Sequence, residues 1–170
     1  CLNEGDTYDA GAVEVKGIEL VASTVFITSG YEFPIQITYT YSDTEFQTAF
    51  SASLYELWGE VEAGDELPYV PEHQLGLSLG ASIGKWDMNA RVKYKSEQRT
   101  TAGQGSAGAT NSIGSFIVTD LSASRSIGDN TKVNLYINNL FDNEYEVSRH
   151  PDGLRPGAPR SIAVGISTSF

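Results

Sequence analysis

The sequence has a single cysteine, few basic residues and no long hydrophobic run. Cys1 alone excludes an internal disulfide framework and any zinc site built from cysteines. Lys and Arg number 11 against 22 Asp and Glu, and a net charge of −11 argues against binding nucleic acid, which rewards basic patches. No apolar run approaches the roughly 20 residues of a membrane-spanning helix. Strands of a membrane barrel need only about 10 alternating residues each, so a membrane location stays open.

Apolar residues instead recur at every second position. The regular segments are 35–42, 75–83, 86–95, 132–137 and 161–170, and the less regular ones are 115–127 and 13–26. Because successive strand side chains point to opposite faces, each segment has one apolar face and one polar or small one. In 13–26 the apolar positions change phase at Gly17, which predicts a β-bulge there. The pattern predicts an all-β chain of about seven antiparallel strands.

Short and long connections alternate between these segments. Turn residues predict short turns at 29–32, 84–85 and 128–130, whereas long connections occupy 49–72, 100–114 and 141–160. This is the layout of an outer-membrane barrel with short periplasmic turns and long outer loops. Such barrels normally have an even number of strands, at least about eight, so we expect an antiparallel meander from a larger barrel. No signal peptide is visible after Cys1, so either the start has been removed or the chain is a piece of something longer, and the strand count favours a piece.

Several motifs along the chain resemble those of one family. Residues 138–145 read N-N-L-F-D-N-E-Y, and residues 153–160 read G-L-R-P-G-A-P-R before a last alternating strand that ends in Phe170. These stretches resemble the N-L-F-D-x-x-Y and G-x-x-P-G-x-P-R motifs of TonB-dependent outer-membrane receptors. The residues that carry this part of the resemblance are Asn139, Leu140, Phe141, Asp142, Tyr145, Gly157, Pro159 and Arg160. Residues 39–46 look like a strand end of the same family, 67–75 like its return from a long loop, and 11–20 like a strand entry. Arg160 begins the last strand, where we expect it to pair with a carboxylate such as Asp142 or Glu144.

The resemblance implies a fold, a location and partners. The fold is a barrel of about 22 strands with a plugged lumen, in which residues 1–170 are a C-terminal fragment without the plug domain. The location is the outer membrane of a Gram-negative-type bacterium, in contact with lipid and lipopolysaccharide. The expected partners are the TonB–ExbB–ExbD complex, acting through the missing plug, and the barrel-assembly machinery, which would read the strand ending in Phe170.

The resemblance also implies a function, the uptake of an iron(III) chelate such as a ferric siderophore or ferric citrate. Residues 101–106 and 58–62 look most like ferric citrate receptors. Such a chelate is anionic, and arginine grips carboxylates bidentately. The candidate ligand-binding residues in or beside the long loops are Arg149, His150, Arg155 and Arg99, with Arg149 first. The alternative for each arginine is pairing with local acids or with lipopolysaccharide phosphates.

A transporter driven by a partner needs no catalytic centre, and we expect no enzyme, no cofactor and no resident metal. The G-x-G-x-x-G at 103–108 precedes a strand and not the helix of a dinucleotide site. Ser106, Asp120 and His150 lack the nucleophile elbow of a hydrolase triad. The acidic run between Glu56 and Glu66 has a calcium interpretation, although such runs are more often solvated. Two other functions stay open: a passive or structural outer-membrane barrel, and a soluble β-sandwich binding module.

Overall fold

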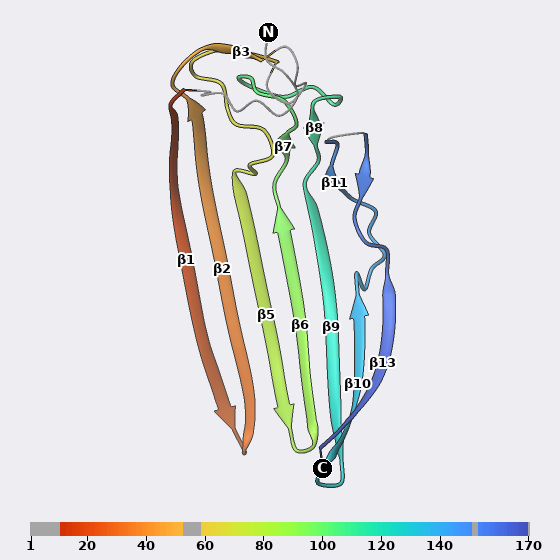
Figure 1. Ribbon diagram of the computed structural model, residues 1–170. Helices are drawn as coiled ribbons and strands as arrows, with labels where there is room; N and C mark the ends of the chain where they lie inside the picture. The colour runs from red at the N-terminus through yellow and green to blue at the C-terminus, as the bar shows by residue number, and fades with distance from the viewer. Residues whose placement is uncertain (1–10, 53–58, 151–152, 170) are drawn as a thin grey trace.

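The computed structural model describes residues 11–52, 59–150 and 153–169. Seven long strands form one sheet in the order β1-β2-β5-β6-β9-β10-β13, with each pair of neighbours antiparallel (Figure 1). Their bounds are β1 Val13–Thr28, β2 Tyr31–Phe46, β5 His73–Ile83, β6 Trp86–Lys95, β9 Phe116–Ile127, β10 Thr131–Asn138 and β13 Ser161–Thr168. The predicted seven-strand meander is confirmed. Over the described ranges, no helix is long and apolar enough to cross a membrane.

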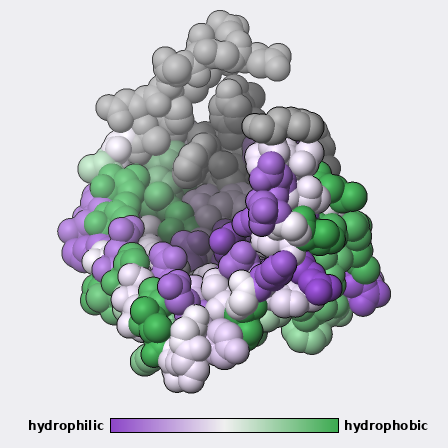
Figure 2. All heavy atoms as spheres, turned by 90° about the horizontal axis from the view of Figure 1, so that it is seen from below, coloured by the Kyte–Doolittle hydropathy of each residue, from purple (hydrophilic) through white to green (hydrophobic). Residues whose placement is uncertain are grey.

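The sheet has two chemically different faces, which we call the apolar face and the polar face. Residues paired across strands share a face, so the register follows each row around the sheet. One row of the apolar face contains Leu20, Tyr39, Leu75, Tyr94 and Ile117. The neighbouring row of the polar face contains Glu19, Thr40, Gln74, Lys95 and Phe116. Seen from the short-turn end, hydrophilic residues surround a hollow and hydrophobic ones gather outside it (Figure 2).

The apolar face is exposed and not covered by a second layer. Leu20 is 58% exposed, Val164 72% and Ile166 74%. A soluble sandwich would bury these side chains between two sheets. Within the described ranges the long strands form one sheet, and the other three sheets have two short strands each. The sandwich alternative is therefore wrong, because nothing in the described fold provides its second layer.

The short turns lie where the sequence predicts them. Thr28 pairs with Tyr31 around Ser29 and Gly30, which both have positive φ, 52° and 79°, as a type I′ hairpin turn requires. The next two turns, at 84–85 and 128–130, connect β5 to β6 and β9 to β10. All three turns therefore lie at the same end of the sheet.

The bulge predicted at Gly17 is wrong. Residues Val13–Thr28 pair one to one with Tyr31–Phe46, without a shift of register. A Cβ atom on Gly17 would lie 2.5 Å from the carbonyl oxygen of Tyr41, so the glycine allows close approach of two backbones. At this end of β1, Val13 pairs with Phe46, which is 1% exposed beneath the long loops.

The long connections form a separate structure at the opposite end, which we call the loop cap (residues 47–72, 96–115 and 139–160, as far as described). It contains β3 (Phe50–Ala52) with β4 (Gly59–Val61), β7 (Gln98–Arg99) with β8 (Ser112–Ile113), and β11 (Glu146–Ser148) with β12 (Arg155–Pro156). The buried hydrophobic residues of the described chain, Phe46, Val61, Ile113 and Val118, lie in or next to this cap. The expectations for Glu56, Trp58 and Phe170 lie outside the described residues.

Candidate functional site

The first part of the candidate site is the corner where β10 leaves the sheet at Asn139. This side chain is 2% exposed, and its residue has a φ of +50°. Its Nδ2 donates to the carbonyl oxygens of Asn143, at 2.9 Å, and Ala158, at 3.0 Å, while its Oδ1 accepts from the Asn143 amide at 3.0 Å. Its own amide donates to Asp120 Oδ1 at 3.0 Å. Asn139 thereby joins β9, β10 and the segment before β13, as expected of an asparagine that ends a strand.

Asp142 continues this corner toward the last strand. Its carboxylate accepts a 2.9 Å hydrogen bond from the Arg160 amide and lies 3.6 Å from the Arg160 guanidinium. The predicted pairing of Arg160 with Asp142 or Glu144 is thus confirmed for Asp142. Both partners are about half exposed, so the ion pair contributes little energy and mainly sets where β13 begins.

Tyr145 and Gly157 form the contact behind the corner. The Gly157 amide donates to the Tyr145 carbonyl oxygen at 2.7 Å, and a Cβ atom on Gly157 would lie 2.1 Å from the Tyr145 ring. That ring lies 4.5 Å, between centroids, from the ring of Phe116. Phe116 interrupts the polar face of its strand in the sequence because it packs against this aromatic side chain. Asn139, Asp142, Tyr145, Gly157 and Arg160 of the family motifs therefore build the corner that leads into β13.

Arg99 is a buried link between two long loops. Its side chain is 7% exposed, its Nε lies 2.9 Å from Glu66 Oε2, and its Nη2 donates to the Gly105 carbonyl oxygen at 2.7 Å. The Glu66 amide donates to the Gly103 carbonyl oxygen at 2.9 Å, which adds a backbone connection between the same loops. The predicted ligand contact of Arg99 stays a prediction, and its guanidinium already has protein partners.

Arg149 connects all three long loops. Its guanidinium binds the carboxylate of Glu146 through both Nε and Nη2 and donates from Nη1 to the carbonyl oxygens of Ala109 and Thr110. The hydrogen bond with Glu146 raises the pKa of Arg149 above its ordinary value. These bonds use four of the five guanidinium donors. A ligand contact through Arg149 stays a prediction, with one donor left for it.

Tyr69 joins the two arginine centres, although the sequence analysis did not single it out. Its amide donates to the Arg99 carbonyl oxygen at 2.9 Å, and its hydroxyl accepts from the Arg149 amide at 3.3 Å. Its φ of +61° is uncommon for an aromatic residue and points to a conformation held by its surroundings. The sequence around it gave no direct signal, because the prolines of P-Y-V-P restrict Leu67 and Val70, the residues that precede them, and not Tyr69.

His150 and Arg155 differ from the two linking arginines. Both are exposed, and the bonds at His150 join its backbone amide and carbonyl to the Ser148 hydroxyl. Neither side chain makes an ion pair with another residue of the described chain. They remain available to an external group at the rim of the cap. His73, by contrast, is structural, since its Nδ1 lies 2.9 Å from the Tyr39 hydroxyl.

A polar cleft of about 310 Å³ opens between the cap and the end of β2. Its walls contain Ser42, Asp43, Thr44, Glu66, Val70, Glu72, Glu97, Gln98, Arg99, Gly105, Ser106 and Ala107. Ser42 and Glu72 are joined through their backbones on the polar face, so the cleft lies at the rim of the hollow side of the sheet. The cleft is a chemically suitable place for a polar solute.

The part of the acidic run that the structure describes does not gather a set of metal ligands. No three metal-ligating side chains there are close enough to hold an ion. The carboxylates have other partners: Glu60 accepts from the Ser51 hydroxyl at 2.6 Å, Asp65 from the Glu62 amide at 3.0 Å, and Glu66 from Arg99. They stabilise loops instead.

Comparison with known proteins gives a family and a set of similar folds. The family model described as "TonB dependent receptor-like, beta-barrel" matches residues 3–140. Among curated proteins, no sequence matches this chain.

Three solved structures illustrate the similarity of fold. The ferric-catecholate import receptor Fiu from Escherichia coli K12 shares 22% identity over 99% of this chain and 23% of its own, with a TM-score of 0.73. The siderophore receptor PiuA from Acinetobacter baumannii shares 21% over 92% of this chain and 22% of its own, with a TM-score of 0.72. The copper transporter OprC shares 18% identity over 93% of this chain and 23% of its own, with a TM-score of 0.64. The chain thus spans less than a quarter of the length of these structures.

Proposed function

Because the chain belongs to the TonB-dependent receptor-like β-barrel family, we propose that it forms C-terminal strands of a larger barrel that imports a ferric chelate, either a siderophore or ferric citrate. Members of this family lie in the outer membrane of Gram-negative bacteria and are not enzymes. The predicted location and the expectation of no enzymatic activity are therefore confirmed. The short turns then lie at the periplasmic end and the loop cap at the outer end.

The observation that carries the proposal is a sheet with an exposed apolar face and two open edges. In the described fold, β1 and β13 each pair with a neighbour on one side only. In lipid, each unsatisfied backbone group on such an edge costs several kcal/mol. Further strands on both edges, as in a barrel of about 22 strands, would satisfy these groups. A plug inside that barrel would contact TonB, which works with ExbB and ExbD.

The proposed cargo is supported by two exposed basic residues at the outer rim. Arg155 and His150 lie on the segment between β10 and β13 without ion-pair partners among the described residues. An anionic iron chelate would find charge-assisted donors there. In this proposal Arg149 and Arg99 support the site by holding the loops, and Arg149 adds its remaining donor. Among the similar structures, Fiu is named as a ferric-catecholate import receptor and FecA as a ferric citrate transporter, whereas OprC is named as a copper transporter.

Uptake by the full-length receptor tests the proposal. The receptor is expressed in a bacterial strain that lacks its own iron-chelate receptors, and uptake of ⁵⁵Fe-citrate, a ⁵⁵Fe-catecholate siderophore and copper is measured with and without TonB. We expect one iron chelate to enter only when TonB is present. Arg155→Gln should raise the half-saturating concentration about tenfold, since one charge-assisted contact is lost. Lys132→Gln, at the periplasmic end, should leave it unchanged.

Two results would contradict the proposal. Uptake that continues without TonB would favour the passive barrel, and uptake of copper with no iron chelate would replace the cargo. An unchanged half-saturating concentration in Arg155→Gln would show that this residue does not contact the ligand. The transport proposal itself would then be decided by the TonB dependence and by which cargo enters.

A further inference from the structure

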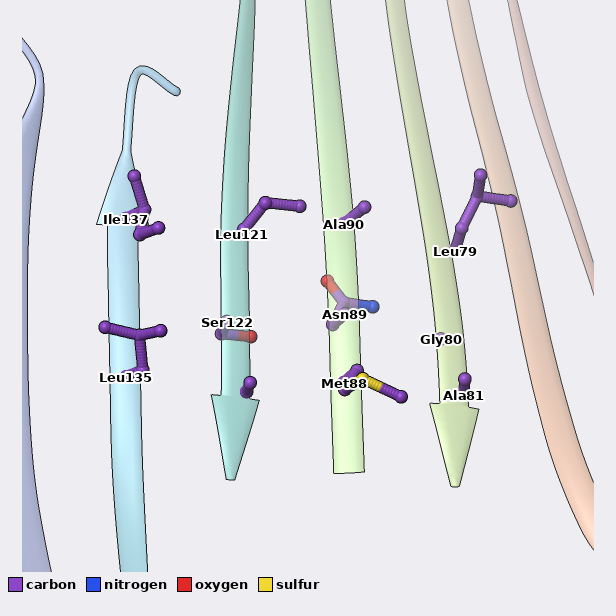
Figure 3. A pocket seen from close by; sticks show the side chains of 11 residues that line it. Leu79, Gly80, Ala81, Met88, Asn89, Ala90, Leu121, Ser122, Leu135 and Ile137 are labelled. Carbon is purple, nitrogen blue, oxygen red and sulfur yellow. The ribbon is translucent and has the colours of Figure 1, made fainter. Parts of the chain in front are cut away.

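The apolar face carries a groove near the periplasmic ends of β5, β6, β9 and β10 (Figure 3). Its volume is about 370 Å³. Two adjacent cross-strand rows border it: Ala81, Met88, Ala123 and Leu135 in one, and Leu79, Ala90, Leu121 and Ile137 in the other. Alanines of one row lie next to longer side chains of the other. Because the alanine side chains are short, they leave a depression between the neighbouring Leu and Met side chains. No charged residue lines the groove.

A cation lies one row closer to the periplasm on the same face. Arg125 pairs with Trp86 on β6 and with Val133 on β10, and the carbon of its guanidinium lies 5.2 Å from the centre of the Trp86 ring. Arg125 is exposed, and none of the ion pairs in the described chain involves it. Among the described residues, the face therefore presents a positive charge without a protein counter-ion directly beside a groove that no charged residue lines.

Aromatic residues set the membrane depth of this arginine. Trp86, which begins β6 directly after its turn, shares this end of the apolar face with Tyr31, which begins β2 directly after the first turn. Aromatic residues of outer-membrane barrels gather at the level of the lipid headgroups. Arg125 thus lies at the headgroups of the periplasmic leaflet, whereas the groove lies in the acyl-chain region.

We propose that Arg125 and this groove bind one anionic phospholipid of the periplasmic leaflet. The phosphate contacts the Arg125 guanidinium, and one acyl chain lies along Ala123, Met88 and Leu121. Two residues along a strand span about 7 Å, which separates the charged row from the first row of the groove and suits the glycerol part of a phospholipid. A cation at one end of a groove without charged residues complements a lipid, which has an anionic headgroup and apolar acyl chains. A peptide would fit less well, because its backbone polar groups would be unsatisfied in the groove. This inference does not depend on the transported cargo.

Fluorescence quenching by brominated lipids tests it in the full-length receptor. The receptor is reconstituted into phosphatidylcholine vesicles and titrated with phosphatidylglycerol or phosphatidylethanolamine that carries bromine on the acyl chains. The Trp86 signal is the component that Trp86→Phe removes. We expect phosphatidylglycerol to quench Trp86 at about fivefold lower mole fraction than phosphatidylethanolamine, because an arginine near a membrane surface favours anionic lipid by that order.

Three variants divide the site into its parts. Arg125→Gln should abolish the fivefold preference while leaving quenching at high lipid, and Ala123→Leu, which fills the groove, should weaken quenching by both lipids alike. Lys132→Gln removes a cation at the same end but on the polar face and should change neither. An unchanged preference in Arg125→Gln, or an equal loss in Lys132→Gln, would overturn the proposal. Absence of quenching by either lipid, together with a dimer in native mass spectrometry, would assign the groove to a second copy instead.

Discussion

The sheet and the loop cap are stabilised in different ways. In the sheet, backbone ladders join the strands, and the large side chains of the apolar face remain exposed, as Val164 and Ile166 show. In the cap, buried polar side chains such as Asn139 and Arg99 bond to the backbone of loops far away in the sequence. A sheet of this kind tolerates many side chains that suit its two surroundings. A cap of this kind depends on a few individual ones.

The largest expected effect is that of Asn139→Ala in the cap. It leaves two carbonyl oxygens and one amide without their buried partner, and we expect the full-length receptor in detergent to lose about 3 kcal/mol of unfolding free energy. The measurement is urea-induced unfolding followed by tryptophan fluorescence. Asn138→Ala is the matched control, since Asn138 is exposed and donates only to the Ser161 hydroxyl, at 3.0 Å. Equal losses in the two variants would show that the corner does not depend on the buried amide.

A smaller effect, about 2 kcal/mol, is expected from Gly17→Ala in the sheet. The new Cβ atom would meet the Tyr41 carbonyl oxygen, and two backbone segments would have to separate to accommodate it. Gly165→Ala provides the control, because nothing lies within 4 Å of a Cβ atom there. If both substitutions are neutral by the same unfolding assay, β1 and β2 are less closely paired than the register indicates.

Arg99→Gln should loosen a loop more than it unfolds the receptor. Without the charged link to Glu66 and Gly105, the loop 100–113 should open more often, and exchange of the Thr100 amide with deuterium should accelerate about tenfold. That amide donates to Asn111 within the same loop at 2.8 Å. Arg155→Gln should leave the exchange unchanged, and acceleration in both variants would indicate a general effect of charge on the cap.

The smallest effect is predicted for Asn89→Ala on the polar face. Its Nδ2 donates to the Ser78 hydroxyl at 2.9 Å, but the backbone ladder between β5 and β6 stays complete without it. We expect a change within about 0.5 kcal/mol in urea unfolding. A loss as large as that of Asn139→Ala would erase the distinction between sheet and cap.

The sheet could be predicted from the sequence because its rule is local. Alternation in segments such as 75–83 and 86–95 identifies the strands, and turn residues such as Ser29 and Gly30 identify where they reverse. The prediction failed at Gly17. A glycine in a strand can mark either a β-bulge or a close approach of two backbones, and the sequence alone does not distinguish them.

The candidate site was less predictable because its contacts join distant segments. Charge and loop position placed Arg149 first among the candidates but did not show which arginines have protein partners. The structure separates them, since Arg99 is bound to Glu66, Arg149 is bound to Glu146, and Arg155 has no ion pair in the described chain. Tyr69 escaped notice for the same reason: both of its partners lie at least one loop away. The pairing of Arg160 with Asp142 was predictable because Arg160 begins the last strand, after a loop that contains the carboxylates of Asp142 and Glu144.

The contacts of Tyr69 with Arg99 and Arg149 also bear on how such a receptor can be re-engineered. A chimera that receives one foreign loop would keep its strands but lose the hydrogen bonds at Tyr69, Arg99 or Arg149. The donors and acceptors of the foreign loop would not match those of the two remaining loops. Transplanting all three loops together keeps those matches intact. The unit to exchange between receptors is therefore the whole loop cap, while the seven strands of the recipient are kept.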